Sequence, residues 1–293
     1  MKKKIFKNKN FLSVIKFLDK FNIKSFETKS KTDLYIKFFE LDKLLKKIPE
    51  DKKEIKISEV LRTVTESYIQ PFKPDIPDLC RLHWIILSRK SLNVLEFGSG
   101  HSTIFMADAH YILDFFFKEL EFSRNKKNFH TYTVEENKYY AQITKKRIPS
   151  YLEKFITIST SKIKTVYYEN RFASKYENLP NISPDFIYLD APSLYFSKKK
   201  FEGFTFARKH RLPMSADILF IEYFLEPGTI VIVDGRTANA RFLKDHLKKK
   251  WKYFHYPKGD LHYFESTEKP LGQLNNRKLK FCLGSKYKNY EKK

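Results

Sequence analysis

The chain has 293 residues, of which 42% are hydrophobic and 31% charged, so it is long enough to bury a full core and its composition excludes a disordered or bulk membrane protein. Its two cysteines, Cys80 and Cys282, cannot form a disulfide framework. The formal net charge is +23, and it gathers at the ends: residues 1–56 carry +9 and residues 268–293 carry +6. Basic ends indicate either attraction to a polyanion such as nucleic acid or a lysine-rich solvated surface.

The first 70 residues are predicted to form a helical, lysine-rich extension. Apolar residues recur at mostly helical spacing from Leu34 to Leu45, and Ser58 can cap a further helix through about Tyr68. Three prolines between residues 71 and 77 then favour a domain boundary. Because lysines interrupt every apolar stretch near the start, we expect no signal peptide and no membrane span, and a cytoplasmic location.

From Asn93 onward, short apolar runs alternate with helical stretches, which is typical of a parallel sheet built from βαβ units. The sequence predicts an α/β, doubly wound, mostly parallel seven-stranded sheet that ends in an antiparallel hairpin. Residues 71–267 would form this domain, followed by a basic C-terminal tail over residues 268–293. The expected strands are Val94–Phe97, Thr131–Val134, Phe155–Ile158, Phe186–Leu189, Ile230–Val233, Tyr253–Tyr256 and Leu261–Phe264. The expected helices are Asp78–Arg89, Thr103–Phe122, Met214–Leu225 and Asn239–Lys249.

A glycine-rich turn after the first predicted strand is the strongest local motif. Gly98 and Gly100 permit backbone conformations and close ligand approach that a Cβ would block. The helix that starts at Ser102 or Thr103 offers unpaired amides and the positive end of its dipole. Taken alone, the pair of glycines also fits an ordinary tight strand-to-helix turn.

Acidic residues stand at the ends of four predicted strands, namely Glu96, Glu135, Asp190 and Asp234. Carboxyl ends of parallel strands line the crevice where ligands bind in this architecture, and an acid after the second strand is placed to accept hydrogen bonds from a ribose diol. A carboxylate just before the first glycine would repel a pyrophosphate, so Glu96 favours a ligand with cationic groups.

The motif Glu96-Phe97-Gly98-Ser99-Gly100-His101-Ser102, followed by the other acidic strand ends and the hairpin, resembles the class I S-adenosylmethionine-dependent methyltransferases. The resemblance covers roughly residues 77–265. It implies that Glu96, Gly98, Gly100 and Ser102 surround the amino-acid part of S-adenosylmethionine and that Glu135 binds its ribose hydroxyls. Ser102 stands where a third glycine is common in the family.

The acceptor side is less defined by the sequence. Asp190 and Asp234 could jointly hold a divalent cation such as Mg²⁺, as in metal-dependent O-methyltransferases, or they could cap local turns. His210, within a basic and aromatic segment, is a candidate general base or a residue of an exposed loop. His255 and His262, on the predicted hairpin, are interpreted as structural. The catalytic candidates are therefore Asp190, His210 and Asp234.

The function that this sequence favours is O-methylation of a hydroxyl on a sugar, a glycan precursor or another small molecule. An RNA methyltransferase that uses the basic ends is one alternative, and a non-catalytic binding protein on the same fold is another. An NAD-dependent dehydrogenase is disfavoured because Glu96 precedes the glycines and because Glu135 follows later than a compact dinucleotide unit requires.

Overall fold

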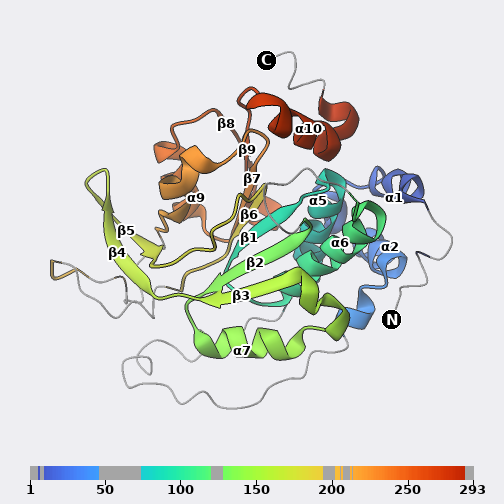
Figure 1. Cartoon of the computed structure of the whole chain (residues 1–293). Coiled ribbons are helices and arrows are strands. Elements are labelled where there is room, and N and C mark those ends of the chain that lie inside the picture. Colours follow the sequence, from blue (N-terminus) through green and yellow to red (C-terminus); the bar gives the residue numbers. More distant parts are fainter. Residues whose placement is uncertain are drawn as a thin grey trace.

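The computed structural model describes residues 6, 10–45, 74–119, 128–193, 202–204, 206, 212 and 214–287. A seven-stranded sheet lies at its centre, with the strand order β3-β2-β1-β6-β7-β9-β8 (Figure 1). Strands β3, β2, β1, β6 and β7 are parallel, whereas β9 is antiparallel to both β7 and β8. The bounds are β1 Asn93–Phe97, β2 His130–Glu135, β3 Ile156–Thr160, β6 Phe186–Leu189, β7 Ile230–Asp234, β8 Trp251–Tyr256 and β9 Leu261–Ser266. The predicted mostly parallel sheet with its C-terminal hairpin is confirmed.

Alternate residues of the central strands enter two separate hydrophobic cores. On β1, Val94 belongs to one core and Leu95 to the other, and both side chains are buried. Strand β7 repeats the pattern, with Ile230 in the first core and Val231 in the second. This two-residue period places apolar groups on both faces, which is why the predicted strands read as continuous apolar runs.

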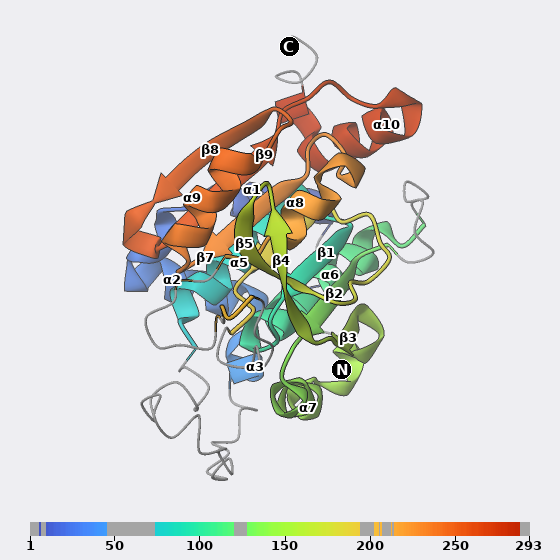
Figure 2. The ribbon, with the colours of Figure 1, turned by 90° about the vertical axis from the view of Figure 1, so that its left-hand side faces the viewer.

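Helices cover both faces of the sheet, as a doubly wound fold requires (Figures 1 and 2). Helices α5 and α6 pack on the first core together with α1 and α2, and α8 and α9 pack on the second. Helix α6 ends at Phe117, five residues before the predicted end. The bounds are α1 Phe11–Leu18, α2 Lys29–Phe39, α5 Ile76–Arg89, α6 His101–Phe117, α7 Lys138–Arg147, α8 Asp217–Ile221 and α9 Thr237–His246.

The N-terminal helices share the first core with the sheet domain. Phe17 stacks on Phe38 with ring centroids 3.5 Å apart, joining α1 to α2. The Tyr35 hydroxyl lies 2.8 Å from His83 Nδ1 on α5, and both side chains are fully buried. Glu40, in the left-handed conformation, ends α2 before the short α3, Asp42–Leu45. The helix predicted between Ser58 and Tyr68 lies outside the described residues.

A second, two-stranded antiparallel sheet was not predicted from the sequence. Strands β4, Ile163–Tyr168, and β5, Arg171–Tyr176, form a hairpin that projects at the left of Figure 1. Its turn residues, Glu169 and Asn170, both have positive φ. The hairpin packs on α8, where Asp217 Oδ1 accepts a hydrogen bond of 2.9 Å from the Tyr176 amide.

The C-terminal segment also contains a helix, α10, Gly272–Leu283. Leu279 of α10 packs so closely on Gly228 that a Cβ there would lie 2.1 Å from Leu279 Cδ2. The Lys278 ammonium lies 3.1 Å from the Glu226 carboxylate. The basic segment is thus a packed element over residues 272–283. No helix in the described ranges has both the length and the hydropathy that crossing a bilayer needs.

Candidate active site

The glycine turn lies where the strand order of the sheet reverses. Strands β2 and β3 extend to one side of β1, and β6 and β7 extend to the other. In open α/β sheets, ligands bind outside the carboxyl ends of the strands at such a switch point. Gly98 has a φ of 93°, and a Cβ there would lie 2.9 Å from the Ala191 Cβ in the segment after β6. Glycine is therefore required for the turn to pass this neighbour.

Glu96, predicted to contact a cofactor, faces the protein instead. Its carboxylate is fully buried and accepts hydrogen bonds from three hydroxyl groups. Burial raises the pKa of Glu96 to about 7, against the opposing effect of these hydrogen bonds. The donors are Ser102 Oγ at 2.5 Å, Thr103 Oγ1 at 2.6 Å and Thr133 Oγ1 at 2.6 Å. Glu96 therefore holds the start of α6 against β2, and Ser102 is one of its partners.

Glu135, at the end of β2, faces the glycine turn. Its Oε2 accepts hydrogen bonds from the Ser99 amide at 2.7 Å and the Ser99 hydroxyl at 2.9 Å, and Oε1 accepts one from the Asn137 amide at 2.9 Å. Burial and the neighbouring Glu136 raise the pKa of Glu135, against these hydrogen bonds. A carboxylate offers about four acceptor positions, so the three bonds leave room for a further donor.

His101, the first residue of α6, is a candidate that sequence reasoning missed. Its Nε2 is buried and has no hydrogen-bond partner within the described part of the chain. Burial, followed by the nearby Arg147, lowers the pKa of His101 to about 4, so the ring is neutral at pH 7. The preceding Gly100 has extended backbone, and among the described residues a Cβ there would meet only Ser102 Oγ, at 4.0 Å. An unsatisfied polar atom beside an open backbone position is a feature that a ligand can complete.

Asp190 follows β6 at the switch point. Its amide donates to the Phe97 carbonyl over 3.2 Å, which joins the segment after β6 to the end of β1. The side chain is 57% exposed, and Arg236 Nε lies 3.9 Å from Oδ1. Loss of hydration and nearby acids raise the pKa of Asp190, whereas Arg236 opposes that rise; because more than half of the side chain is exposed, solvent limits the shift. A solvent-reachable carboxyl with a raised pKa can accept a proton.

Asp234, at the end of β7, is engaged by Tyr188, whose hydroxyl donates to Oδ2. The Arg236 guanidinium donates to the carbonyl oxygens of Asp190, at 2.7 Å, and Pro192, at 3.1 Å. Of the two carboxylates predicted to hold a divalent cation, Asp190 thus lies near the Arg236 guanidinium, and Asp234 accepts a hydrogen bond from the Tyr188 hydroxyl. This arrangement does not favour a metal between them, and that metal stays an untested prediction.

One further prediction concerns the acceptor side. His210 lies outside the described residues. Asn239, five residues after Asp234, is fully buried and exchanges hydrogen bonds with the amide and carbonyl of Ser215. It is therefore engaged in packing α9 on the segment before α8.

Glu136 was also missed, because an acid one residue past a strand end carries no distinctive pattern. Its Oε1 accepts a 2.6 Å hydrogen bond from the Ser193 amide, and its Oε2 accepts a 2.7 Å bond from the Tyr176 hydroxyl. Glu136 therefore ties the segment after β6 to the β4–β5 hairpin at the edge of the candidate site.

No protein-family model matches the sequence, and no curated protein matches it. Solved structures with a similar fold include an O-methyltransferase from Bacillus cereus in complex with SAH, at 15% identity and a TM-score of 0.38, covering 74% of this chain and 93% of that protein. The O-methyltransferase TomG from Streptomyces achromogenes, in complex with SAM, has 16% identity and a TM-score of 0.38, over 72% and 91%. An SAH-bound methyltransferase from Podospora anserina has 12% identity and a TM-score of 0.37, over 78% and 95%. At these TM-scores, the functional assignment has to rest on the site itself.

Proposed function

We propose that this protein is an S-adenosylmethionine-dependent methyltransferase that acts on a hydroxyl group. The observation that carries the proposal is the placement of the Gly98–Gly100 turn at the switch point of the sheet, between Glu135 on one side and Asp190 on the other. A glycine turn before a helix N-terminus suits the charged amino-acid part of the cofactor, and an acid at the end of the second strand suits a ribose.

The residues of the turn fit this cofactor. The first amides of α6 and the positive end of its dipole would receive the carboxylate of the amino-acid part, beside the open position at Gly100. His101 Nε2, which has no hydrogen-bond partner in the part of the chain that the structure describes, would gain a polar neighbour. The remaining acceptor position of Glu135 would take a ribose hydroxyl. When bound, the cofactor supplies a methyl group made electrophilic by its sulfonium.

The chain must then align a hydroxyl acceptor and remove its proton, because methyl transfer is an in-line attack. Asp190 is the residue best placed for that proton: it is 57% exposed, lies at the switch point and has a raised pKa. Arg236, which binds the carbonyl oxygens around Asp190, holds this carboxyl in place. A raised pKa makes a carboxylate a stronger base, which favours proton transfer.

The acceptor is proposed to be a hydroxyl of a sugar, a glycan precursor or another small molecule. The segment after β6, Asp190-Ala191-Pro192-Ser193, lacks the N/D-P-P-Y/F motif of methyltransferases that act on the exocyclic amines of bases. The Asp190 carboxyl, as a base, and the guanidinium beside it suit a polar acceptor molecule whose hydroxyl gives up a proton.

Isothermal titration with S-adenosylhomocysteine tests the cofactor part of the proposal. Wild-type protein is expected to bind it, and Glu135→Gln, which replaces one acceptor oxygen with an NH₂ donor, is expected to bind about tenfold more weakly. Glu268→Gln, a surface carboxylate paired with Lys249, is the matched control and should bind like wild type. Failure of wild type to bind the nucleoside, or tighter binding of NAD, would contradict the proposal.

A further inference from the structure

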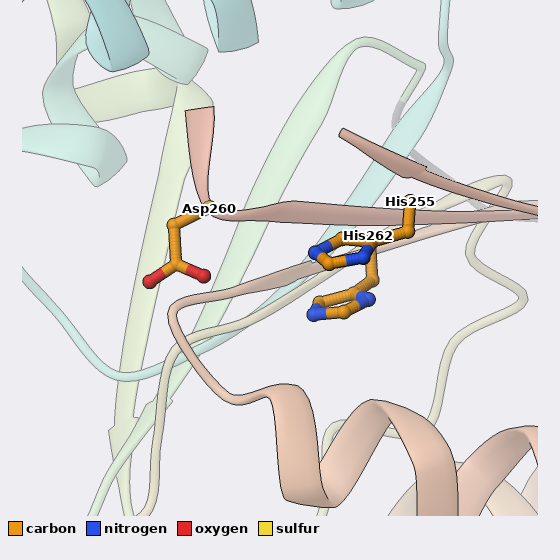
Figure 3. Close-up of side chains that lie close together, drawn as sticks. All are labelled: His255, Asp260 and His262. Atoms are coloured by element: carbon orange, nitrogen blue, oxygen red, sulfur yellow. The ribbon is translucent and has the colours of Figure 1, made fainter. Parts of the chain in front are cut away.

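Three side chains of types that can ligate a metal come together on the C-terminal hairpin, beside the end of β7. His255 on β8 and His262 on β9 are cross-strand partners in register, and Asp260 closes the connection between these strands. One ligand atom from each of the three lies within 4.8 Å of the others. Figure 3 shows the two rings one above the other, with one nitrogen of each ring on the side of the Asp260 carboxylate.

The ring geometry suits neutral imidazoles. The His255 and His262 rings have centroids 4.0 Å apart and an interplanar angle of 9°. Two imidazolium cations would repel each other strongly at this distance, so at least one ring must be neutral and keep a lone pair for a ligand.

The backbone around the cluster is well anchored. The Asp260 carbonyl accepts a 2.9 Å hydrogen bond from the Gly235 amide, which joins the hairpin connection to the residue after β7. Asp260 itself has a positive φ of 42°, and its amide donates to the Pro257 carbonyl over 3.1 Å. The Asp260 carboxylate therefore projects from a hydrogen-bonded turn that connects β8 to β9 and lies directly before β9.

Hydroxyl groups already orient the His262 ring. Thr237 Oγ1 lies 3.0 Å from Nε2, and Tyr253 Oη lies 2.9 Å from Nδ1. Metal-ligating histidines are usually held in this way at the ring nitrogen that does not bind the metal. A metal would replace one of these two hydroxyls, and the other would keep the ring in place.

We propose that His255, Asp260 and His262 form a binding site for a divalent transition metal of the zinc class. Two imidazoles and one carboxylate are a common donor set for Zn²⁺, with ligand distances of about 2.0–2.2 Å. The two rings lie parallel in this structure, so binding a metal requires them to rotate until their nitrogen lone pairs converge on one point. Three protein ligands leave one coordination position of the metal open to solvent. This site does not depend on the proposed methyl transfer.

Titration of the full chain, expressed without a histidine tag and treated with a chelator, tests the site. Co²⁺ is the probe, because it substitutes for Zn²⁺ and a tetrahedral complex absorbs visible light. We expect one equivalent to produce this absorption and Zn²⁺ to displace it. No visible absorption with wild-type protein would overturn the proposal.

Variants locate the ion. His255→Ala and Asp260→Asn are each expected to weaken Co²⁺ binding at least about tenfold, since they remove a direct ligand. Asp245→Asn on α9, an exposed carboxylate, is the matched control and should bind Co²⁺ like wild type. Far-UV circular dichroism confirms that each variant is folded, and Asp260→Asn, at an exposed turn, serves if His255→Ala does not fold. Unchanged binding by both variants, or loss of binding in Asp190→Asn instead, would overturn the assignment.

Discussion

The two ends of strand β6 carry aspartates with opposite surroundings. Asp185, just before the strand, is buried and its two carboxylate oxygens accept hydrogen bonds from the amides of Leu92 and Asn93 at 2.9–3.1 Å. Asp190, just after the strand, is 57% exposed and has Arg236 3.9 Å away. Asp185 thus satisfies backbone amides at one end of β6, whereas Asp190 at the other end is exposed and available to react.

The rest of each end follows the same division. At the amino end, Arg89 donates to Glu265 at 2.9 Å and to the Gly228 carbonyl at 2.7 Å, and α10 covers this region. At the carboxyl end, His101 Nε2 has no partner among the residues that the structure describes. Asn93 Oδ1, at the amino end, also has no partner among the described residues, so the two ends differ mainly in place: the open polar groups of the carboxyl end lie at the switch point of the sheet, where ligands bind in this architecture.

Loss of the Asp190 carboxylate should have the largest effect. Asp190→Asn is expected to lower the rate of methyl transfer by about 10²–10⁴-fold, because the variant cannot take the acceptor proton. The wild-type rate should fall as the pH drops and Asp190 becomes protonated, at a higher pH than for an ordinary aspartate because its pKa is raised, and the variant should lack this decline.

The measurement is transfer of labelled methyl from S-adenosylmethionine across a pH series. Affinity for S-adenosylhomocysteine and the thermal midpoint should stay close to wild type in Asp190→Asn. A variant with wild-type rate and pH profile would show that the two aspartates do not differ as described.

Loss of the Asp185 carboxylate should affect stability rather than chemistry. Asp185→Ala leaves two buried backbone N–H groups without acceptors, so the free energy of unfolding should fall by on the order of 3 kcal/mol. Urea unfolding measures this loss, and the folded variant should keep its affinity for S-adenosylhomocysteine. Wild-type stability in Asp185→Ala would refute the view that the amino end is held by this carboxylate.

A smaller effect is expected from pH alone. Burial raises the pKa of Glu96 and of Asp217 to about 7, so the folded state binds these protons more tightly than the unfolded chain. Their contribution to stability is therefore complete below the unfolded pKa and is lost as the pH rises through about 7. Between pH 6.5 and 8 each group should change the free energy of unfolding by on the order of 1 kcal/mol.

Thermal denaturation should thus show a higher midpoint at pH 6.5 than at pH 8. Below pH 6.5 the trend should weaken, because burial lowers the pKa of His101 to about 4 and that of His110 to about 3, and these rings charge only on unfolding. Glu96→Gln should flatten the dependence above pH 6.5. A midpoint that rises from pH 6.5 to pH 8 would be incompatible with these buried acids.

Prediction from sequence was most successful where one local pattern determines one element. The strands that contain Val94 and Ile230 are buried on both faces. Their sequences are therefore continuous apolar runs, which predict buried strands. The β4–β5 hairpin was missed because its strands are only partly buried and so carry no continuous apolar run, and because its turn of Glu169 and Asn170 lacks glycine.

Among the candidate site residues, the sequence located Glu96, Glu135 and Asp190 at strand ends, but their side-chain partners depend on the fold. Three hydroxyls from α6 and β2 surround Glu96, and no spacing rule specifies that they converge. The roles suggested for Glu136 and His101 likewise depend on neighbours that are distant in the sequence.

The amino-acid sequence by itself determined the parallel sheet, its glycine turn and the acids at its carboxyl edge, because strand periodicity, glycine conformation and strand ends are local properties. Only the tertiary structure decided which acid is buried, which is exposed, and that two histidines interpreted as structural lie stacked beside Asp260. Burial, pKa and ligand geometry depend on groups that are distant in the sequence and meet only in the folded chain, so a local sequence pattern cannot predict them.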